Sequence, residues 1–139
     1  MVPKEDSMVI EKYIPERLYG FVTNGEVRLY FHLAAFDPGP YLGQTPVPPV
    51  IGESVEVHRA DEGNKALSVS RINSPLEIEG LVDWFDEVKG YGFASTDEGN
   101  FYMHRSEVLG GRLPVSGRRV FFYVSEGNKR ACHIRVESP

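Results

Sequence analysis

Residues 89–94 read Lys-Gly-Tyr-Gly-Phe-Ala, so two aromatic residues alternate with a glycine and an alanine. Successive side chains of a β-strand point to opposite faces. On the strand that this pattern predicts, Tyr91 and Phe93 share one face, while Gly92 and Ala94 share the other. Because small side chains suit the crowded interior of a small barrel, we expect both aromatic rings to point outward.

The next predicted strand, at residues 101–104, reads Phe-Tyr-Met-His and divides in the same way. Its phenylalanine and methionine share one face, and Tyr102 and His104 share the other. Trp84, on the preceding predicted strand, extends the set of rings. A single aromatic residue more often belongs to a core, but two alternating pairs favour an exposed patch. Each exposed ring offers a surface on which an unpaired base can stack, for about 1–3 kcal/mol per base.

The pattern occurs twice in the chain. A shift of 72 residues places Tyr19-Gly20-Phe21 on Tyr91-Gly92-Phe93 without a gap, and it also places Tyr30 and His32 on Tyr102 and His104. Internal repeats of this kind indicate repeated structural units. We therefore expect two domains, residues 1–73 and residues 74–139, divided near the turn-forming triplet Asn-Ser-Pro at 73–75.

Beyond Phe36 and Val108 the shift becomes 65 residues, so the first copy carries an insertion of seven residues. It lies within residues 37–51, where proline and glycine predict an irregular loop. The loop contains Tyr41; we expect the loop to close a connection, with covering of the first aromatic face or contact with a partner as the alternatives.

Short strands separated by glycine-containing turns fill each copy. In the second copy they are expected at residues 79–85, 91–95, 101–104, 120–125 and 130–136. Five such strands suit a small closed barrel, which leaves few open sheet edges. The predicted class is all-β, with two five-stranded barrels in tandem.

The second copy resembles the cold-shock domain family. Residues 83–86 read Asp-Trp-Phe-Asp and lead into Lys-Gly-Tyr-Gly-Phe, which is similar to the family's Trp-Phe pair followed by Lys-Gly-Phe-Gly-Phe. Residues 101–104 resemble its second motif, Val-Phe-Val-His-Phe, and the resemblance runs from Glu79 to Val136. It implies an OB-fold barrel that binds single-stranded nucleic acid, often pyrimidine-rich, without catalysis.

The resemblance implies a set of nucleic-acid-binding positions in the second copy, with two departures. Asp83 stands where the family usually has a lysine, which removes a phosphate contact. Arg105 stands where a third aromatic residue is common, and its guanidinium can still stack on a base. The expected binding residues are Trp84, Lys89, Tyr91, Phe93, Tyr102, His104, Arg105 and Lys129.

The first copy resembles the family less closely. Lys12 replaces the tryptophan, Leu18 replaces the first glycine of the motif, and Leu33 stands in the third-aromatic place. Two interpretations stay open: this copy also binds nucleic acid, or it is retained for packing or for docking a partner. Its candidate binding residues are Lys12, Arg17, Tyr19, Phe21, Tyr30 and His32.

Composition narrows the function further. The single cysteine, Cys132, and four dispersed histidines provide no zinc set, and no nucleotide-binding or hydrolase motif occurs, so we expect no metal, no cofactor and no enzyme activity. No apolar stretch approaches membrane-spanning length, and we expect a soluble cytoplasmic protein. The formal net charge of −5 argues weakly against nucleic-acid binding, although a face that grips bases by stacking needs few cations.

Two functions remain. The leading hypothesis is a protein that binds single-stranded RNA or DNA and holds strands unpaired, as an RNA chaperone or as a regulator of transcription or translation. The rival is a protein–protein adaptor built on an OB scaffold, which docks on polymerase or ribosome through the first domain. The aromatic patch favours nucleic acid, whereas the acidic balance and the altered first copy favour the adaptor.

Overall fold

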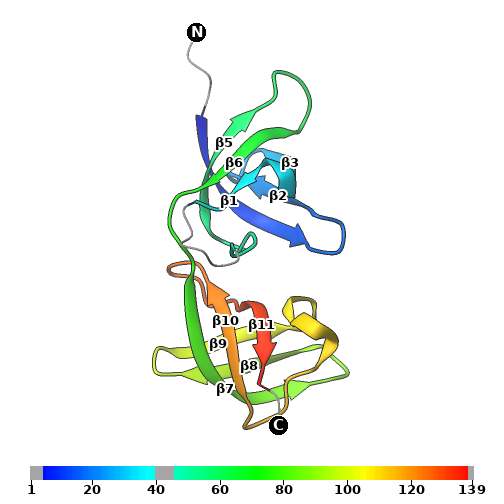
Figure 1. Cartoon of the computed structure of the whole chain (residues 1–139), viewed down its shortest axis with the longest axis vertical. Helices are drawn as coiled ribbons and strands as arrows, with labels where there is room; N and C mark the ends of the chain where they lie inside the picture. The colour runs from blue at the N-terminus through cyan, green and yellow to red at the C-terminus, as the bar shows by residue number, and fades with distance from the viewer. Residues whose placement is uncertain (1–4, 40–45, 138–139) are drawn as a thin grey trace. The chain divides into compact units, whose positions relative to one another are not determined.

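The structure is a computed structural model that describes residues 5–39 and 46–137. It divides the chain into two units, Met1–Pro75 and Leu76–Pro139 (Figure 1). Tyr41, named above as part of the inserted loop, lies outside the described residues. No helix in the described part of the chain is long and apolar enough to cross a membrane.

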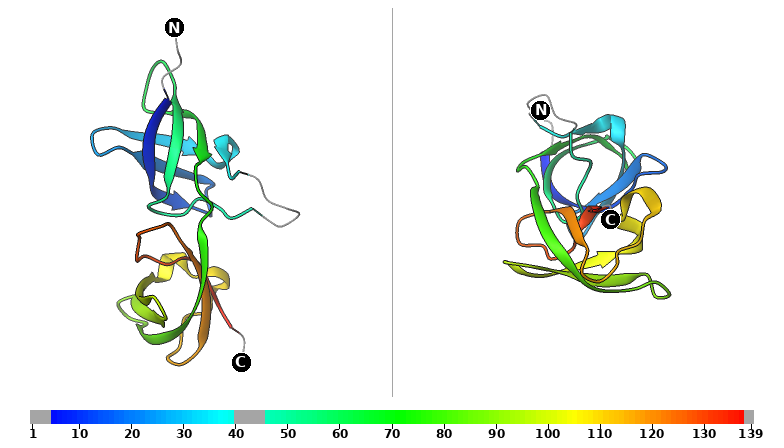
Figure 2. Two further views of the ribbon diagram at one scale, coloured as in Figure 1. Left: turned by 90° about the vertical axis from the view of Figure 1, so that its left-hand side faces the viewer. Right: turned by 60° about the horizontal axis from the view of Figure 1, so that its bottom comes forward.

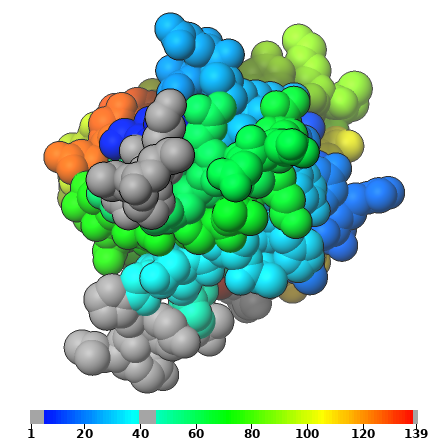
Figure 3. Space-filling model, turned by 90° about the horizontal axis from the view of Figure 1, so that it is seen from above, coloured from blue at the N-terminus to red at the C-terminus, as the bar shows by residue number. Residues whose placement is uncertain are grey.

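The first unit is a mostly antiparallel sheet with the strand order β3-β2-β1-β5-β6-β4. Its long first strand pairs with β5 through its first half and with β2 through its second half. The hairpin of β5 and β6 forms much of the surface seen in Figure 3. The elements are β1 (Glu5–Ile14), β2 (Tyr19–Thr23), β3 (Arg28–His32), the 3-10 turn η1 (Leu33–Ala35), β4 (Phe36–Asp37), β5 (Ser54–Arg59) and β6 (Ala66–Arg71).

The second unit repeats this plan in a five-stranded sheet with the order β11-β10-β7-β8-β9. Its long first strand, β7, pairs with β10 and then with β8. The elements are β7 (Leu76–Asp86), β8 (Tyr91–Thr96), β9 (Gly99–His104), the 3-10 turns η2 (Arg105–Glu107) and η3 (Leu109–Gly111), β10 (Arg119–Val124) and β11 (Cys132–Val136).

Each sheet curves round its own interior and closes into a barrel (Figure 2). A parallel bridge between Tyr30 and Lys65 closes the first unit, and a bridge between Tyr102 and Arg130 closes the second. The Tyr102 amide donates to the Lys129 carbonyl at 2.7 Å, which fixes this closure. The predicted all-β class with two tandem OB-type barrels is confirmed.

The sixth strand of the first unit is a small addition to the five that were predicted. β4 has two residues, and its Phe36 pairs in parallel with Val69 of β6. The corresponding residues of the second unit, Val108 and Ile134, form a single parallel bridge. The two barrels therefore share this contact, and the first extends it by one residue pair.

Apolar side chains on the inner faces of the strands form a separate core in each unit. Phe31, Val22 and Val57 are fully buried in the first, and Phe122, Met103 and Ala94 are fully buried in the second. Burying a large apolar side chain stabilises a fold by about 1.5–3 kcal/mol. These cores fix the face of each strand that is left to point outward.

The Pro-rich insertion is tied to the first barrel by a buried ion pair. The Arg71 guanidinium donates to both carboxylate oxygens of Glu53, at 2.7 and 2.8 Å, and both side chains are at least 95% buried. The same guanidinium donates to the carbonyls of Val47 and Pro48, at 2.9 Å each. Glu53 also accepts the Val50 amide at 2.7 Å. The described end of the insertion is thereby anchored to β6.

Candidate nucleic-acid interface

Five rings of the second unit lie together on its outer surface, and we call them the second ring face: Trp84, Tyr91, Phe93, Tyr102 and His104. Register brings them together, because Trp84 pairs with Phe93, Phe93 with Tyr102, and Tyr91 with His104 across β7, β8 and β9. Ring centroids are 5.5 Å apart for Trp84 and Phe93, and 5.8 Å apart for Phe93 and Tyr102. The rings thus form a continuous patch over three strands.

The outward direction of these rings follows from the residues between them. Gly92 and Ala94 are buried, and a side chain at Gly92 would overlap the carbonyl oxygen of Trp84. The rings on β8 remain half-exposed, and Trp84 is 40% exposed. The structure therefore places the rings outward, as the alternation predicts.

His104 is oriented by the turn that follows it. Its Nδ1 accepts the Ser106 amide at 3.1 Å and lies 2.8 Å from the Ser106 hydroxyl. Because Nδ1 accepts a hydrogen bond from a backbone amide, a neutral ring carries its own proton on Nε2, which can donate to a ligand. His32 repeats the arrangement, since its Nδ1 accepts the Ala34 amide at 3.0 Å.

The predicted cations of the second unit lie round the edge of the ring face. Lys89 is exposed in the turn before β8. The Arg105 guanidinium donates to the Glu87 carbonyl and so lies against that turn, not over a ring. Lys129 donates to the Glu98 carbonyl at 3.0 Å. The guanidinium carbon of Arg130, on the segment that closes the barrel beside Tyr102, lies 5.6 Å from the Tyr102 ring centroid.

Asp86 holds the turn that carries Lys89. Its carboxylate accepts the amides of Val88 and Lys89, at 2.9 and 3.0 Å. These hydrogen bonds, the one from Lys89 foremost, lower the pKa of Asp86 because they favour the charged form. The turn ends at Gly90, whose φ of +79° suits glycine, while the equivalent Leu18 of the first unit has a φ of +57°.

The first unit has a corresponding set, the first ring face: Tyr19, Phe21, Tyr30 and His32. The centroids of Tyr19 and Tyr30 are 5.4 Å apart, and those of Phe21 and Tyr30 are 6.2 Å apart. Lys12 pairs with Phe21 across β1 and β2, in the register that brings Trp84 to Phe93. Arg17 is exposed in the turn between β1 and β2.

Arg28, which was not among the predicted binding residues, belongs to the same surface. Its guanidinium carbon lies 3.9 Å from the Phe21 ring centroid, and its Nε lies 2.8 Å from the Glu11 carboxylate. The signal was present, because Arg28 alternates with Tyr30 and His32 on β3 and so shares their face.

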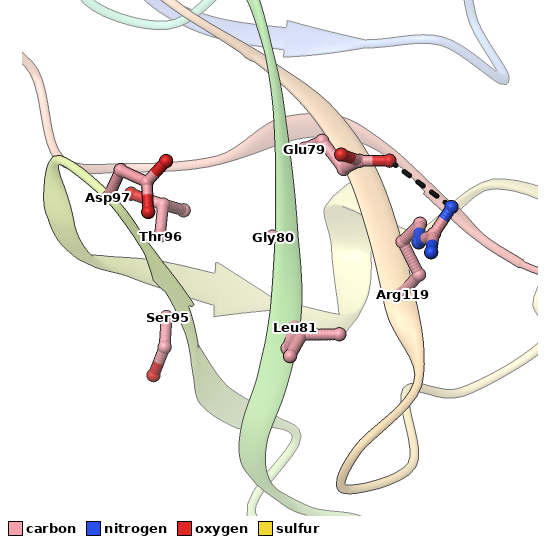
Figure 4. A pocket seen from close by; sticks show the side chains of 7 residues that line it. All are labelled: Glu79, Gly80, Leu81, Ser95, Thr96, Asp97 and Arg119. Atoms are coloured by element: carbon pink, nitrogen blue, oxygen red, sulfur yellow. Dashed lines mark ion pairs between the residues drawn. The ribbon is translucent and has the colours of Figure 1, made fainter.

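Each unit also has a hollow lined by its described residues, none of which belongs to a ring face. One, of about 480 Å³, is lined by Glu79 and Asp97 as well as by Leu81, and Arg119 pairs with Glu79 at 3.5 Å (Figure 4). The other, of about 220 Å³, is formed by apolar residues and prolines of η1, β4 and the insertion. Among the described residues no group of three or more metal-binding side chains occurs.

The chain is similar to known proteins in sequence and in structure. No family model matches the chain. A cold shock-like protein of Thermotoga maritima is 41% identical over 64 residues, which are 42% of this chain and 97% of that protein. Cold shock-like protein CspA of Vibrio cholerae is 37% identical over 57 residues and is covered to 81%. The solved structure drosophila Unr CSD456 aligns with 98% of this chain at 17% identity and a TM-score of 0.39, and 63% of that chain is covered.

Proposed function

The chain belongs to the cold-shock protein family, a family of nucleic-acid-binding proteins and not of enzymes, and we propose that it binds single-stranded RNA or DNA on the second ring face. Its role would be to hold strands unpaired, as an RNA chaperone or as a regulator of transcription or translation. We also propose that residues 1–73 and 74–139 act as separate domains.

The single observation that carries the proposal is the cluster of outward-facing, partly exposed rings on β7, β8 and β9. Trp84 is in contact with Tyr91 and Phe93, each at 5.5 Å between centroids, and Tyr91 stacks on Tyr102 at 6.1 Å. An apolar surface of this kind stays exposed at a cost in hydration, and bases that stack on it recover that cost. Any base can stack on a tryptophan or tyrosine ring, which suits a protein that binds single strands of many different sequences.

Cations contribute less than rings to this face. The net charge is −5, and the guanidinium of Arg105 and the ammonium of Lys129 are engaged with main-chain carbonyls. The salt dependence of the affinity measures how many phosphates the protein neutralises. On single strands, the logarithm of the binding constant falls with the logarithm of the salt concentration by about 0.7 per phosphate contact. We therefore expect a shallow dependence, with Lys89 as one contributor.

The test is Phe93→Ala in the full chain, measured by fluorescence anisotropy of labelled oligo-U and oligo-dT. Anisotropy is preferred to Trp84 emission because that indole lies 5.5 Å from the altered ring. Loss of one stacking platform should weaken binding by about 1–3 kcal/mol, which is roughly five- to 150-fold in Kd. Phe121→Ala is the matched control: Phe121 is also half-buried on an outer face, but it lies on β10 beside Arg135.

Equal affinity of Phe93→Ala and wild type would reject the ring face as the binding surface. Failure of the wild-type chain to bind either oligonucleotide at low salt would reject nucleic-acid binding altogether and would favour the adaptor hypothesis. Equal losses in Phe93→Ala and Phe121→Ala would show that general destabilisation, and not the face, is responsible.

A further inference from the structure

We propose that the first unit binds a nucleobase on the guanidinium of Arg28. This guanidinium provides the planar stacking surface that the Trp84 indole provides in the second unit. The inference rests on the proposed function, because it assigns a ligand contact to the second of two related surfaces. It concerns the end of the first ring face that faces β1, where Lys12 leaves no ring.

The Arg28 side chain reaches across the sheet. It begins on β3 opposite Thr23, passes over the Phe21 ring of β2 at 3.9 Å from the centroid, and ends at Glu11 of β1. Three strands are therefore bridged by one side chain. The Phe21 ring carries a guanidinium, so a base that arrives here meets Arg28 and the neighbouring rings together.

Comparison of the two units shows why an arginine is found here. The 72-residue register pairs Arg28 with Asn100, Glu11 with Asp83 and Lys12 with Trp84. In the second unit the indole lies 5.5 Å from Phe93. In the first unit the indole is missing, and the guanidinium reaches the equivalent ring from the opposite strand. A planar group therefore lies close to the equivalent ring in both units, an indole in the second and a guanidinium in the first.

The arginine is held in orientation but is not enclosed. Phe21 and Glu11 position it, while its side chain is 52% exposed and that of Glu11 is 39% exposed. An ion pair exposed to this degree is weak and leaves the remaining N–H groups accessible. A guanidinium is planar, stacks on rings and bases, and donates hydrogen bonds from its edge. A base stacked on Arg28 would keep Phe21 as the support beneath it.

The proposal makes the planar shape of Arg28 essential, as well as its charge. Lysine keeps the charge but is a compact ammonium without a stacking plane. Arg28→Lys therefore separates stacking from simple attraction of phosphate. Arg59→Lys is the matched control, because Arg59 is also ion-paired in the first unit, with Asp6 at 3.5 Å, but lies on β5, a strand that carries no residue of the first ring face.

The experiment is a titration of the ¹⁵N-labelled full chain with a short oligo-U, followed by NMR. Amide signals of β2 and β3 report the first unit, and those of β8 and β9 report the second. We expect Arg28→Lys and Arg28→Ala each to weaken binding at the first unit by roughly five- to tenfold, with the second unit unchanged. Arg59→Lys should bind like the wild type at both units. The unbound spectrum of each variant serves to check that its first barrel is folded.

Four results would each overturn the inference. Wild-type affinity in Arg28→Lys would mean that only charge matters, and tighter binding in Arg28→Ala would mean that the arginine covers Phe21 against the ligand. Shifts confined to the second unit of the wild-type chain would reject the first ring face as a binding surface while leaving the proposed function intact. An absence of shifts in both units would reject the proposed function itself.

Discussion

Replacement of Glu53 by glutamine tests whether the buried ion pair holds the first barrel together. Glutamine keeps the shape of the side chain but leaves the Arg71 guanidinium without its counter-charge, in a site where both side chains are at least 95% buried. The carbonyls of Val47 and Pro48 still accept from Arg71, yet they carry no full charge. We therefore expect a large part of the penalty of a buried charge that has lost its partner.

The expected loss of unfolding free energy in Glu53→Gln follows from the burial of the ion pair, and its importance follows from the small size of the unit. Breaking a buried pair by removing one partner costs about 3–5 kcal/mol, and the oxygen that glutamine retains places Glu53→Gln near 3 kcal/mol. A unit of 75 residues has a total stability of about 4–11 kcal/mol at 0.05–0.15 kcal/mol per residue. The substitution therefore removes a quarter or more of the stability of the first barrel.

The chain supplies its own pair of probes for this measurement. Trp84 is the only tryptophan and lies in the second unit, so its fluorescence reports the second barrel, while far-UV circular dichroism reports both. With a urea m-value of about 1–1.5 kcal/mol/M for so small a unit, the midpoint of the first barrel should fall by about 2–3 M. The Trp84 transition should not move.

Arg119→Met is the control, because Arg119 is 51% exposed and meets Glu79 and Glu137 at 3.5 and 3.7 Å. Exposed pairs of this kind contribute below about 1 kcal/mol. A cost of Glu53→Gln below 1 kcal/mol would refute the reasoning about the buried pair. A parallel shift of the Trp84 transition would refute the proposed independence of the two domains.

Two further predictions concern turns. Leu18→Gly should stabilise the first unit by roughly 0.5–1 kcal/mol, because a left-handed leucine costs about 1–2 kcal/mol and glycine returns part of that gain as chain entropy; a lower midpoint in the circular dichroism transition would contradict this. Asp86→Asn should lower the urea midpoint of the Trp84 fluorescence transition at neutral pH. The pKa of Asp86 is lower in the folded chain than in the unfolded one, so its charge stabilises the fold above the usual carboxyl range, and this stabilisation is lost as the pH falls through the folded-state pKa. The difference from wild type should therefore vanish in acid, and a difference that persists there would show that the charge of Asp86 is not the cause.

Much of the fold follows from short-range pattern. The alternation at Tyr91 and Phe93 predicts both the strand and its outward face, because the identity of the inner residues is local information. The internal repeat predicts two similar barrels for the same reason. The predicted strand at residues 79–85 began too late, since β7 starts at Leu76. Its first residues pair with β10, where Leu76 meets Val124, and such a distant partner leaves little local signal.

Side-chain contacts between distant residues were harder to predict. Arg71 and Glu53 are 18 residues apart, and only the folded chain shows that they enclose the end of the insertion. The position of Arg28 over Phe21 depends on Glu11 of a third strand. The sequence predicts that Arg105 stacks on a base, but in the structure its guanidinium donates a hydrogen bond to the nearby Glu87 carbonyl. Long polar side chains take the partner that the fold presents, which composition and spacing do not specify.

Closure of each barrel by its last segment has a consequence for protein synthesis. Lys65 and the strand β6 that follows it complete the first barrel, and β6 ends at Arg71, before β7 begins at Leu76. Domains fold as units during translation, with the N-terminal one first. All strands of the first barrel are thus made before any strand of the second. This order protects a chain whose β1 and β7 align without a gap from strand exchange between its two halves.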